Sequence, residues 1–223
     1  MRLNKFIAST GFCSRRKADE LIKSGKVRIN GEPATLGHQV DPQTDQISVH
    51  GKTIATPAKF TYIMLHKPTG YITTKADLQD DQTIYALLPQ KHHHLHPVGR
   101  LDRESEGLLL LTDDGDFTYQ MTHPSNDSEK IYQVKIKNPL NPNQIQKIES
   151  GIIIEEKKGP YKTRPCEIKS IGVNRFEITL HEGRNRQIRK MFKAAGSSVV
   201  FLKRIKMGKH ELGKLKKGDW KNV

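Results

Sequence analysis

Four consecutive leucines, Leu108 to Leu111, constrain the fold of this chain more than any other stretch. Gly107 precedes the run, and Asp113, Asp114 and Gly115 follow it, so turn-forming residues bound it on both sides. An apolar run of this length predicts a fully buried strand or a buried helix segment. In either case the residues just before Gly107 lie at the edge of a core element, where side chains can meet a ligand.

Asp102 lies on a predicted turn just ahead of the leucine run, in the stretch Gly99-Arg100-Leu101-Asp102-Arg103. Gly99 allows the backbone to approach a ligand closely. The flanking arginines favour the ionised form of the carboxylate, in which it can act as a nucleophile or a base. The alternative is an ordinary aspartate at the end of an element, ion-paired with its neighbours.

The charge of the chain points to a polyanionic partner. The formal net charge is +14 over 223 residues, which is typical of proteins that neutralise nucleic-acid phosphates. No apolar run is long enough to span a bilayer, and residues 1–10 lack the apolar core of a signal peptide. The two cysteines, Cys13 and Cys166, lie far apart in the sequence, so we expect a reducing cytoplasm and no disulfide framework.

The first thirty residues predict two short helices and a strand. Apolar residues recur at roughly helical spacing, Ser14 is placed to cap the second helix, and Val27 to Ile29 alternates as a strand before the turn pair Asn30-Gly31. Basic residues cluster at the start of the second helix, where the helix dipole also favours an anion. They either form a solvated helix face or contact the RNA backbone, and the charge of the whole chain favours contact with RNA.

A linker is expected at residues 51–59, which contain Pro57 and small polar residues. A second unit then opens with a strand at Phe60 to Leu65, followed by the turn signature Lys67-Pro68-Thr69-Gly70. Strands outnumber helices in this second unit and follow one another closely. The sequence therefore predicts an α+β fold, with a small N-terminal α/β domain and a larger body on a mainly antiparallel sheet.

Tyr132 lies in an alternating strand, Glu129 to Ile136, on the same side as Val134 and Ile136. Such a tyrosine is either ordinary core packing or an aromatic ring that stacks on an extruded base.

A basic stretch follows from Arg184 to Lys217, with a predicted helix at Gln187 to Ala195. Ile188, Met191 and Phe192 share its apolar face, and Arg189 lies next to that face, from which it could enter a pocket. The alternative is a basic helix on an RNA-facing surface, and both descriptions can hold together.

Two clusters of residues could be taken for metal-binding sites, but we expect neither of them to bind a metal ion. The histidines at 92, 93, 94 and 96 would alternate faces in a strand and lack a carboxylate or cysteine partner at a familiar spacing. Asp113, Asp114 and Asp116 are better explained by a turn and a helix start.

The N-terminal motifs resemble a known RNA-binding domain. These are Arg2-Leu3-Asn4-Lys5-Phe6-Ile7, then Cys13-Ser14-Arg15-Arg16, then Gly25-Lys26-Val27-Arg28-Ile29-Asn30-Gly31. Their order resembles the small domain named after ribosomal protein S-four, over residues 1–50. That resemblance implies that the domain binds structured RNA. It implies nothing about a reaction.

The body resembles the pseudouridine synthases. Gly99-Arg100-Leu101-Asp102, Tyr132 within Lys130-Ile131-Tyr132, and Gln187-Ile188-Arg189 occur in the order of that family. Lys67-Pro68-Thr69-Gly70, His123-Pro124-Ser125 and Glu182-Gly183-Arg184-Asn185-Arg186-Gln187 are similar to the RsuA/RluB/RluE/RluF group of ribosomal RNA enzymes. The resemblance covers essentially the whole chain, with residues 60–223 as the catalytic domain.

The resemblance implies isomerisation of a specific uridine in ribosomal RNA, without cofactor or metal. Asp102 would be the catalytic carboxylate, either attacking the anomeric carbon or removing the neighbouring ribose proton; Arg189 would pair with it, and Tyr132 would stack on the uracil. Ile188 would form an apolar wall, and Arg100 would fill the gap left by the extruded base. Contacts to RNA would also come from Lys67, Arg15, Arg16, Lys17, Lys26, Arg28, Arg184 and Arg186. One family variant has lysine at the position of Arg189, and the arginine here favours large-subunit rRNA as the substrate. We also expect the protein to be a monomer.

Two functions of other classes remain as alternatives. A ribosome-assembly factor that only binds RNA fits the charge and the first domain, but has no need of a carboxylate in a basic cleft. A metal-dependent nuclease would use Asp113, Asp114 and Asp116, and would cleave the chain that an isomerase leaves intact.

Overall fold

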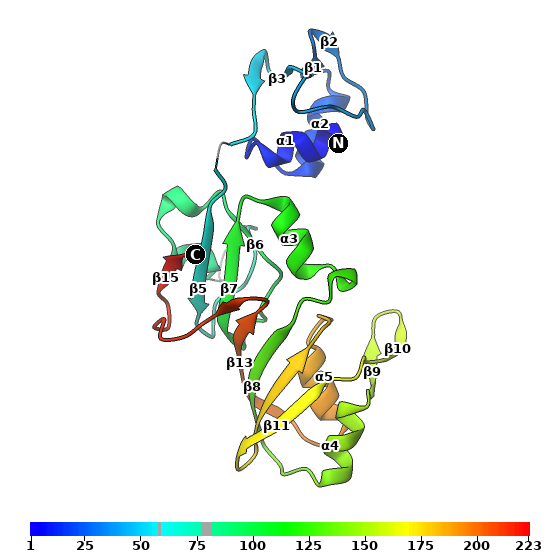
Figure 1. The fold of residues 1–223 in the computed structure, drawn as a ribbon, viewed down its shortest axis with the longest axis vertical. Coiled ribbons are helices and arrows are strands. Elements are labelled where there is room, and N and C mark those ends of the chain that lie inside the picture. The colour runs from blue at the N-terminus through cyan, green and yellow to red at the C-terminus, as the bar shows by residue number, and fades with distance from the viewer. Residues whose placement is uncertain (58, 77–81) are drawn as a thin grey trace. The chain divides into compact units, whose positions relative to one another are not determined.

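The structure is a computed structural model that describes residues 1–57, 59–76 and 82–223, and the chain forms two compact units in it (Figure 1). The first unit contains Met1–Thr61 and Asp113–Gly115, and the second contains Tyr62–Thr112 and Asp116–Val223. Among the described residues, no helix has the length and apolar character needed to cross a membrane.

The first unit packs two helices, α1 (Leu3–Ser9) and α2 (Arg15–Lys23), with a four-stranded sheet. The sheet order is β2-β1-β3-β4, all antiparallel, with bounds β1 (Val27–Ile29), β2 (Glu32–Pro33), β3 (Ile47–Val49) and β4 (Lys52–Ile54). Leu3, Phe6 and Ile7 of α1 and Ile22 of α2 are buried in its core. The predicted helix pair and first strand are confirmed.

Two local signals set this unit's elements. The Ser14 hydroxyl accepts a hydrogen bond of 3.2 Å from the backbone N–H of Lys17, which is the predicted cap of α2. Asn30 and Gly31 have φ of +51° and +89°, as a tight hairpin turn between β1 and β2 requires. β4 falls inside the expected linker 51–59 and pairs with β3, so part of that stretch belongs to the sheet; residue 58 lies outside the described residues.

The second unit is built on a sheet of order β11-β12-β8-β13-β7-β5-β15, with β14 beside β13 and β6 beside β7. The strands are β5 (Tyr62–Lys67), β6 (His96–Pro97), β7 (Glu106–Thr112), β8 (Lys130–Ile136), β11 (Glu167–Gly172), β12 (Arg175–Leu180), β13 (Val199–Met207), β14 (His210–Glu211) and β15 (Trp220–Asn222). β13 and β7 run parallel, and the other described pairs in this sheet are antiparallel. The predicted α+β class with a mainly antiparallel sheet is confirmed.

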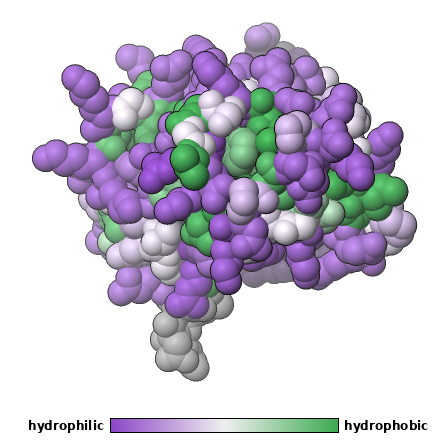
Figure 2. All heavy atoms as spheres, turned by 90° about the horizontal axis from the view of Figure 1, so that it is seen from below, coloured by the Kyte–Doolittle hydropathy of each residue, from purple (hydrophilic) through white to green (hydrophobic). Residues whose placement is uncertain are grey.

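Short helices and a ribbon complete this unit. They are α3 (Gly115–Thr122), α4 (Pro142–Glu149), α5 (Gln187–Ala194), the 3-10 helices η1 (Ile84–Leu87), η2 (Gln90–His92) and η3 (Pro124–Asn126), and the antiparallel pair β9 (Ile153–Glu156) and β10 (Gly159–Lys162). Met191 and Phe192 of α5 pack with Val134 of β8 in one buried cluster. Figure 2, which views the molecule from below Figure 1, shows a mostly hydrophilic face with hydrophobic residues between.

The leucine run is the interior strand β7, and every residue of that strand is buried. Leu109 and Leu111 pack in one hydrophobic cluster, whereas Leu108 and Leu110 pack in another, as alternate side chains of a strand must. Both faces of β7 are therefore covered, which explains why Leu108 to Leu111 are all apolar instead of alternating with polar residues. The strand places the turn before Glu106 at the edge of this core.

Candidate active site

A pocket of about 250 Å³ opens where four segments of the second unit meet. Its walls come from the turn that precedes β7, from β8, from the segment between the end of β12 and the start of α5, and from Leu202 of β13. Of the residues predicted to carry function, it brings together Arg100, Asp102, Tyr132, Arg184, Arg186 and Ile188. Segments that are distant in the sequence thus converge on one cavity.

Asp102 lies in the turn that leads into β7. The backbone N–H of Ser105 donates a 3.0 Å hydrogen bond to its carbonyl, which closes the turn. The side chain is 29% exposed, so the carboxylate remains accessible from the pocket while Leu101 beside it is buried. Neighbouring Arg100 is exposed on the pocket wall.

Lys67 is not placed to bind RNA, contrary to the expectation from the resemblance. Its side chain is fully buried at the end of β5. The ammonium donates three hydrogen bonds to backbone carbonyls, to Pro68 at 3.0 Å, Asp102 at 3.0 Å and Ser105 at 2.8 Å. Burial lowers its pKa from 10.5 to about 8, against the opposing effect of nearby carboxylates. Lys67 therefore fastens the Asp102 turn from inside the protein.

The arginine paired with Asp102 is Arg186, whereas the sequence predicted Arg189. Arg186 Nη1 lies 3.9 Å from Asp102 Oδ2. Arg189 instead donates to backbone carbonyls, to that of Val199 at 3.2 Å and that of Glu104 at 3.0 Å, and to the Ser105 hydroxyl at 3.3 Å. Arg189 thus stabilises the turn that carries Asp102. The ion-pair contact with the carboxylate comes from Arg186, in the loop ahead of α5.

Arg186 is shared between two carboxylates. Its Nη1 donates a 2.7 Å hydrogen bond to Glu104 Oε2, in addition to the longer contact with Asp102. The hydrogen bond lowers the pKa of Glu104 and raises that of Arg186. Arg186 has φ of +53°, an uncommon backbone conformation for a residue other than glycine. The turn of the chain at this residue directs its side chain toward the two acids.

Tyr132 and Ile188 supply the apolar part of the pocket. Tyr132 on β8 is half-buried and packs against two hydrophobic clusters. Ile188, in the first turn of α5, is 4% exposed. A planar base could therefore lie between an aromatic ring and an aliphatic side chain, with a carboxylate nearby.

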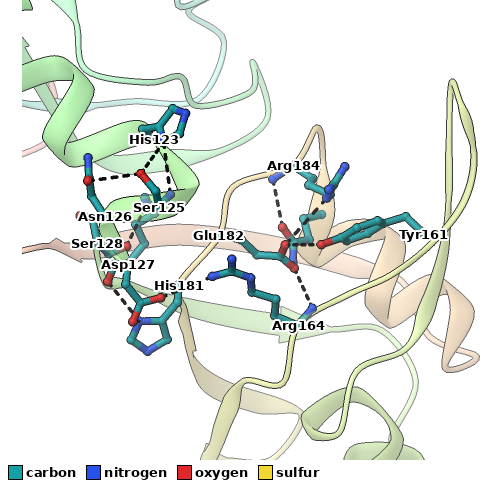
Figure 3. Close-up of polar contacts among 12 residues, drawn as sticks. His123, Ser125, Asn126, Asp127, Ser128, Tyr161, Arg164, His181, Glu182 and Arg184 are labelled. Carbon is teal, nitrogen blue, oxygen red and sulfur yellow. Dashed lines mark hydrogen bonds and ion pairs between the residues drawn. The ribbon is translucent and has the colours of Figure 1, made fainter.

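Glu182, which lies in a family motif but had no predicted role, is the buried carboxylate that organises the pocket rim (Figure 3). Its Oε1 accepts from the backbone N–H of Arg164 at 3.0 Å and from Gln187 Nε2 at 2.6 Å, and its Oε2 accepts from the Tyr161 hydroxyl at 2.8 Å. A single side chain thus connects β10, α5 and the loop between β12 and α5. The signal that could have identified it was an acidic residue directly after a strand and ahead of a basic loop.

The basic residues of the N-terminal unit lie on its surface. The side chains of Arg15, Arg16, Lys17, Lys26 and Arg28 are all exposed. Lys17 forms an ion pair of 2.8 Å with Glu20 one turn along α2. Arg15 and Arg16 are exposed beside it at the start of α2, whereas Lys26 and Arg28 lie beyond the end of that helix.

The histidine run does not form a cluster. His92 is buried against Trp220, with ring centroids 4.7 Å apart, whereas Nε2 of His93 lies 3.0 Å from the carbonyl of Leu88. Within residues 1–57, 59–76 and 82–223, no group of three or more His, Cys, Asp or Glu side chains is placed to hold a metal ion.

Comparisons with known proteins agree over both units. Residues 61–194 match the family described as RNA pseudouridylate synthase, and residues 1–47 match the S4 domain. The ribosomal large subunit pseudouridine synthase B of Bacillus subtilis is 39% identical over 98% of this chain and 90% of its own length. The ribosomal small subunit pseudouridine synthase A of Pasteurella multocida is 34% identical over 100% of this chain and 96% of its own. A solved pseudouridylate synthase superposes with a TM-score of 0.72 at 32% identity, covering 100% of this chain and 96% of that one.

Proposed function

The chain belongs to the RNA pseudouridylate synthase family, and from that premise we propose that it converts one specific uridine of ribosomal RNA to pseudouridine, with Asp102 as the catalytic carboxylate. The observation that carries the proposal is the pocket itself. It places an accessible carboxylate beside an arginine, an aromatic ring and a buried aliphatic side chain.

The reaction is an isomerisation, so no atom is gained or lost. The bond between ribose C1′ and uracil N1 breaks, the uracil turns over, and a bond forms between C1′ and C5. The proton on C5 leaves, and N1 gains a proton. Asp102 begins the reaction in one of two ways, by attacking C1′ or by removing the proton from the adjacent ribose carbon. Either route requires the carboxylate in its ionised form.

The neighbouring side chains have complementary roles. Arg186, whose Nη1 lies 3.9 Å from the carboxylate, places a positive charge beside it and fixes its direction. Tyr132 stacks on the uracil and is placed to assist the late removal of the proton from C5, and Ile188 forms the opposite wall. Arg189 acts through the backbone of Glu104 and the Ser105 hydroxyl, so it is a positioning residue for the turn.

The substrate is a structured region of ribosomal RNA. A base within a duplex must be extruded to reach the pocket, which costs a few kcal/mol. Arg100, exposed on the pocket wall, would occupy the space that the base leaves. Arg184 would contact the flanking RNA, and the exposed basic residues of the N-terminal unit would hold its phosphates. Residues 1–50 serve as the RNA-binding domain and residues 60–223 as the catalytic domain of a monomer that works in the cytoplasm.

We favour the large ribosomal subunit as the source of the target uridine. Support comes from Arg189 and from the large-subunit relative of Bacillus subtilis, at 39% identity. A relative of similar length is named for the small subunit, at 34% identity. Both rRNAs therefore belong in the experiment.

The test compares both rRNAs from cells that lack the protein with those from cells that carry wild type, Asp102→Asn or Asp116→Asn. Pseudouridines are mapped by carbodiimide adducts and reverse-transcriptase stops. We expect one stop, in the large-subunit rRNA, to vanish in the null strain and to return with wild type and with Asp116→Asn, but not with Asp102→Asn. Asp116 is the matched control because it is an exposed aspartate at the start of α3.

If Asp102→Asn restored the stop, Asp102 would not be the catalytic carboxylate. An unchanged map in the null strain would leave the assembly-factor alternative, in which the protein binds rRNA without modifying it. A stop lost from the small-subunit rRNA instead would keep the reaction and overturn the subunit assignment.

A further inference from the structure

We infer that Arg184 and Tyr161 form a preassembled stacking platform for a nucleobase next to the target uridine. The inference rests on the proposed function, because it takes RNA as the strand that passes the pocket. The platform lies at the pocket rim, since Arg184 and its anchor Glu182 both line the cavity. It would give the enzyme a contact with a neighbouring nucleotide that is separate from its contacts with the uracil.

The two side chains are already stacked in the absence of RNA. The central guanidinium carbon of Arg184 lies 3.3 Å from the ring centroid of Tyr161, which is close van der Waals contact (Figure 3). Tyr161 comes from the ribbon strand β10, and Arg184 from the loop that precedes α5. Although it rests on the ring, the Arg184 side chain remains 41% exposed, so a ligand can still reach it.

A buried carboxylate fixes both partners. Glu182 is 6% exposed, and its Oε2 accepts the 2.8 Å hydrogen bond from Tyr161 and lies 3.8 Å from Arg184 Nε. Gln187 reinforces the loop, because its Oε1 accepts a 3.0 Å hydrogen bond from the backbone N–H of Arg184. Since the ring and the guanidinium are held by the same anchor, little conformational entropy remains to be lost when a base binds.

The charge of the assembly favours a base over a phosphate as its main ligand. Glu182 offsets much of the positive charge of Arg184 locally, which weakens the attraction for a phosphate. A guanidinium is planar and weakly hydrated, and it stacks readily on aromatic faces. A base laid on Arg184 would form a three-layer stack of base, guanidinium and tyrosine. Single-stranded RNA is recognised in this manner on aromatic rings and arginine planes.

The experiment measures binding of a fluorescently labelled uridine octamer by anisotropy at several salt concentrations. The proteins are the full-length wild type, Arg184→Lys, Tyr161→Ala, Tyr161→Phe and the double variant Tyr161→Ala with Arg184→Lys. Arg184→Lys keeps the charge and removes the plane. We expect it to weaken binding about fivefold or more, with the slope of log affinity against log salt unchanged. Tyr161→Phe keeps the ring, and we expect a much smaller loss.

The double variant decides whether the two residues act as one unit. If they form a platform, Tyr161→Ala and Arg184→Lys weaken binding by similar factors, and the double variant binds no more weakly than either alone. Octamer affinity of Arg184→Lys equal to that of wild type, or losses that multiply in the double variant, would overturn the inference. Circular dichroism and thermal melting establish that each variant is folded, and Arg184→Lys alters only an exposed side chain.

This outcome is independent of the proposed reaction. If the octamer results hold while the rRNA pseudouridine map of the null strain is unchanged, the reaction fails and the platform stands as an RNA contact. If a mapped uridine depends on Asp102 but Arg184→Lys binds like wild type, the platform alone fails.

Discussion

The ammonium of Lys67 donates a 3.0 Å hydrogen bond to the backbone carbonyl of Asp102, across 35 residues of sequence. Two further carbonyls, of Pro68 and Ser105, accept from the same nitrogen. A buried cation therefore defines the backbone path of the turn that presents the carboxylate. Its replacement is expected to alter both the stability of the protein and the position of Asp102.

The variant Lys67→Met nearly retains the length of the side chain but removes a hydrogen-bond donor from three backbone carbonyls, those of Pro68, Asp102 and Ser105. The Asp102 carbonyl keeps only the bond from the Ser105 N–H. We expect the free energy of unfolding to fall by about 2–4 kcal/mol, measured by urea denaturation. The rate of pseudouridine formation at saturating rRNA should fall as well, since the turn loses its internal anchor. Lys67→Arg is a useful comparison because it keeps the charge in a larger group. Unchanged stability in Lys67→Met would contradict the anchoring role.

Stability should depend on pH through Lys67. Its pKa is about 8 in the folded protein and has an ordinary value of 10.5, so between these two values the unfolded chain binds a proton that the folded chain has released. The free energy of unfolding contributed by this group therefore rises as pH increases from about 8 to about 10.5, by up to about 3 kcal/mol. Wild type should gain stability relative to Lys67→Met over that window. A difference between the two proteins that does not change with pH would contradict this.

At Gly107 the backbone of β7 lies directly against Arg204 of β13. It has φ of +111°, and a Cβ built on it would overlap the backbone oxygen and nitrogen of Arg204. Gly107→Ala is expected to destabilise the protein by about 3 kcal/mol or more, because the parallel pair at the centre of the sheet must separate. Thermal unfolding measures the loss. Gly115→Ala is the matched control, since no described residue beyond its own helix and chain neighbours lies within 4 Å of a Cβ at that position.

The carboxylates of Glu104 and Asp102 compete for Arg186. Arg186→Gln removes the cation that lies 3.9 Å from the Asp102 carboxylate, and we expect the single-turnover rate to fall about tenfold or more. Glu104→Gln frees Arg186 to approach Asp102, so its rate should stay within a few-fold of wild type. Glu104 is 57% exposed, so its loss should change stability by less than about 1 kcal/mol. Equal damage from both variants would mean that the three residues act as one unit.

The basic face of α2 should govern the salt dependence of RNA binding. Replacing Arg15, Arg16 and Lys17 by glutamine is expected to reduce the slope of log affinity against log salt by about 2. The expected change in slope is smaller than that for three free charges, because Lys17 is paired with Glu20 at 2.8 Å. Anisotropy with a labelled rRNA stem-loop measures the slope. A triple variant of Lys147, Lys169 and Lys193, exposed lysines of the other unit, should leave it almost unchanged.

Local patterns predicted much of the fold. The leucine run, the alternation around Tyr132, the cap at Ser14 and the turn at Asn30 depend on residues within a few positions of one another, and each element is present. The predicted linker was partly wrong because β4 gains its strand conformation from pairing with β3, which short polar residues do not signal.

The site was less predictable, because its geometry depends on contacts between distant segments. Arg186 and Arg189 lie three positions apart, and the positive φ of Arg186 decides which of them meets Asp102. The sequence around a lysine at the end of a strand does not indicate that its ammonium is buried. The prediction that Lys67 contacts RNA was therefore wrong. Glu182 and Tyr161 are joined across 21 residues, and no periodicity within either segment indicates the bond.

The position of β13 in the sheet has a consequence for the order in which the protein can become functional during its synthesis. The strand lies between β7 and β8 in the sheet, yet it spans Val199–Met207 and follows both of them in the sequence. Until it emerges from the ribosome, the segment with Asp102 and the segment with Tyr132 have no strand joining them. The segment that forms the N-terminal sheet and helices is therefore synthesised in full well before the pocket can form.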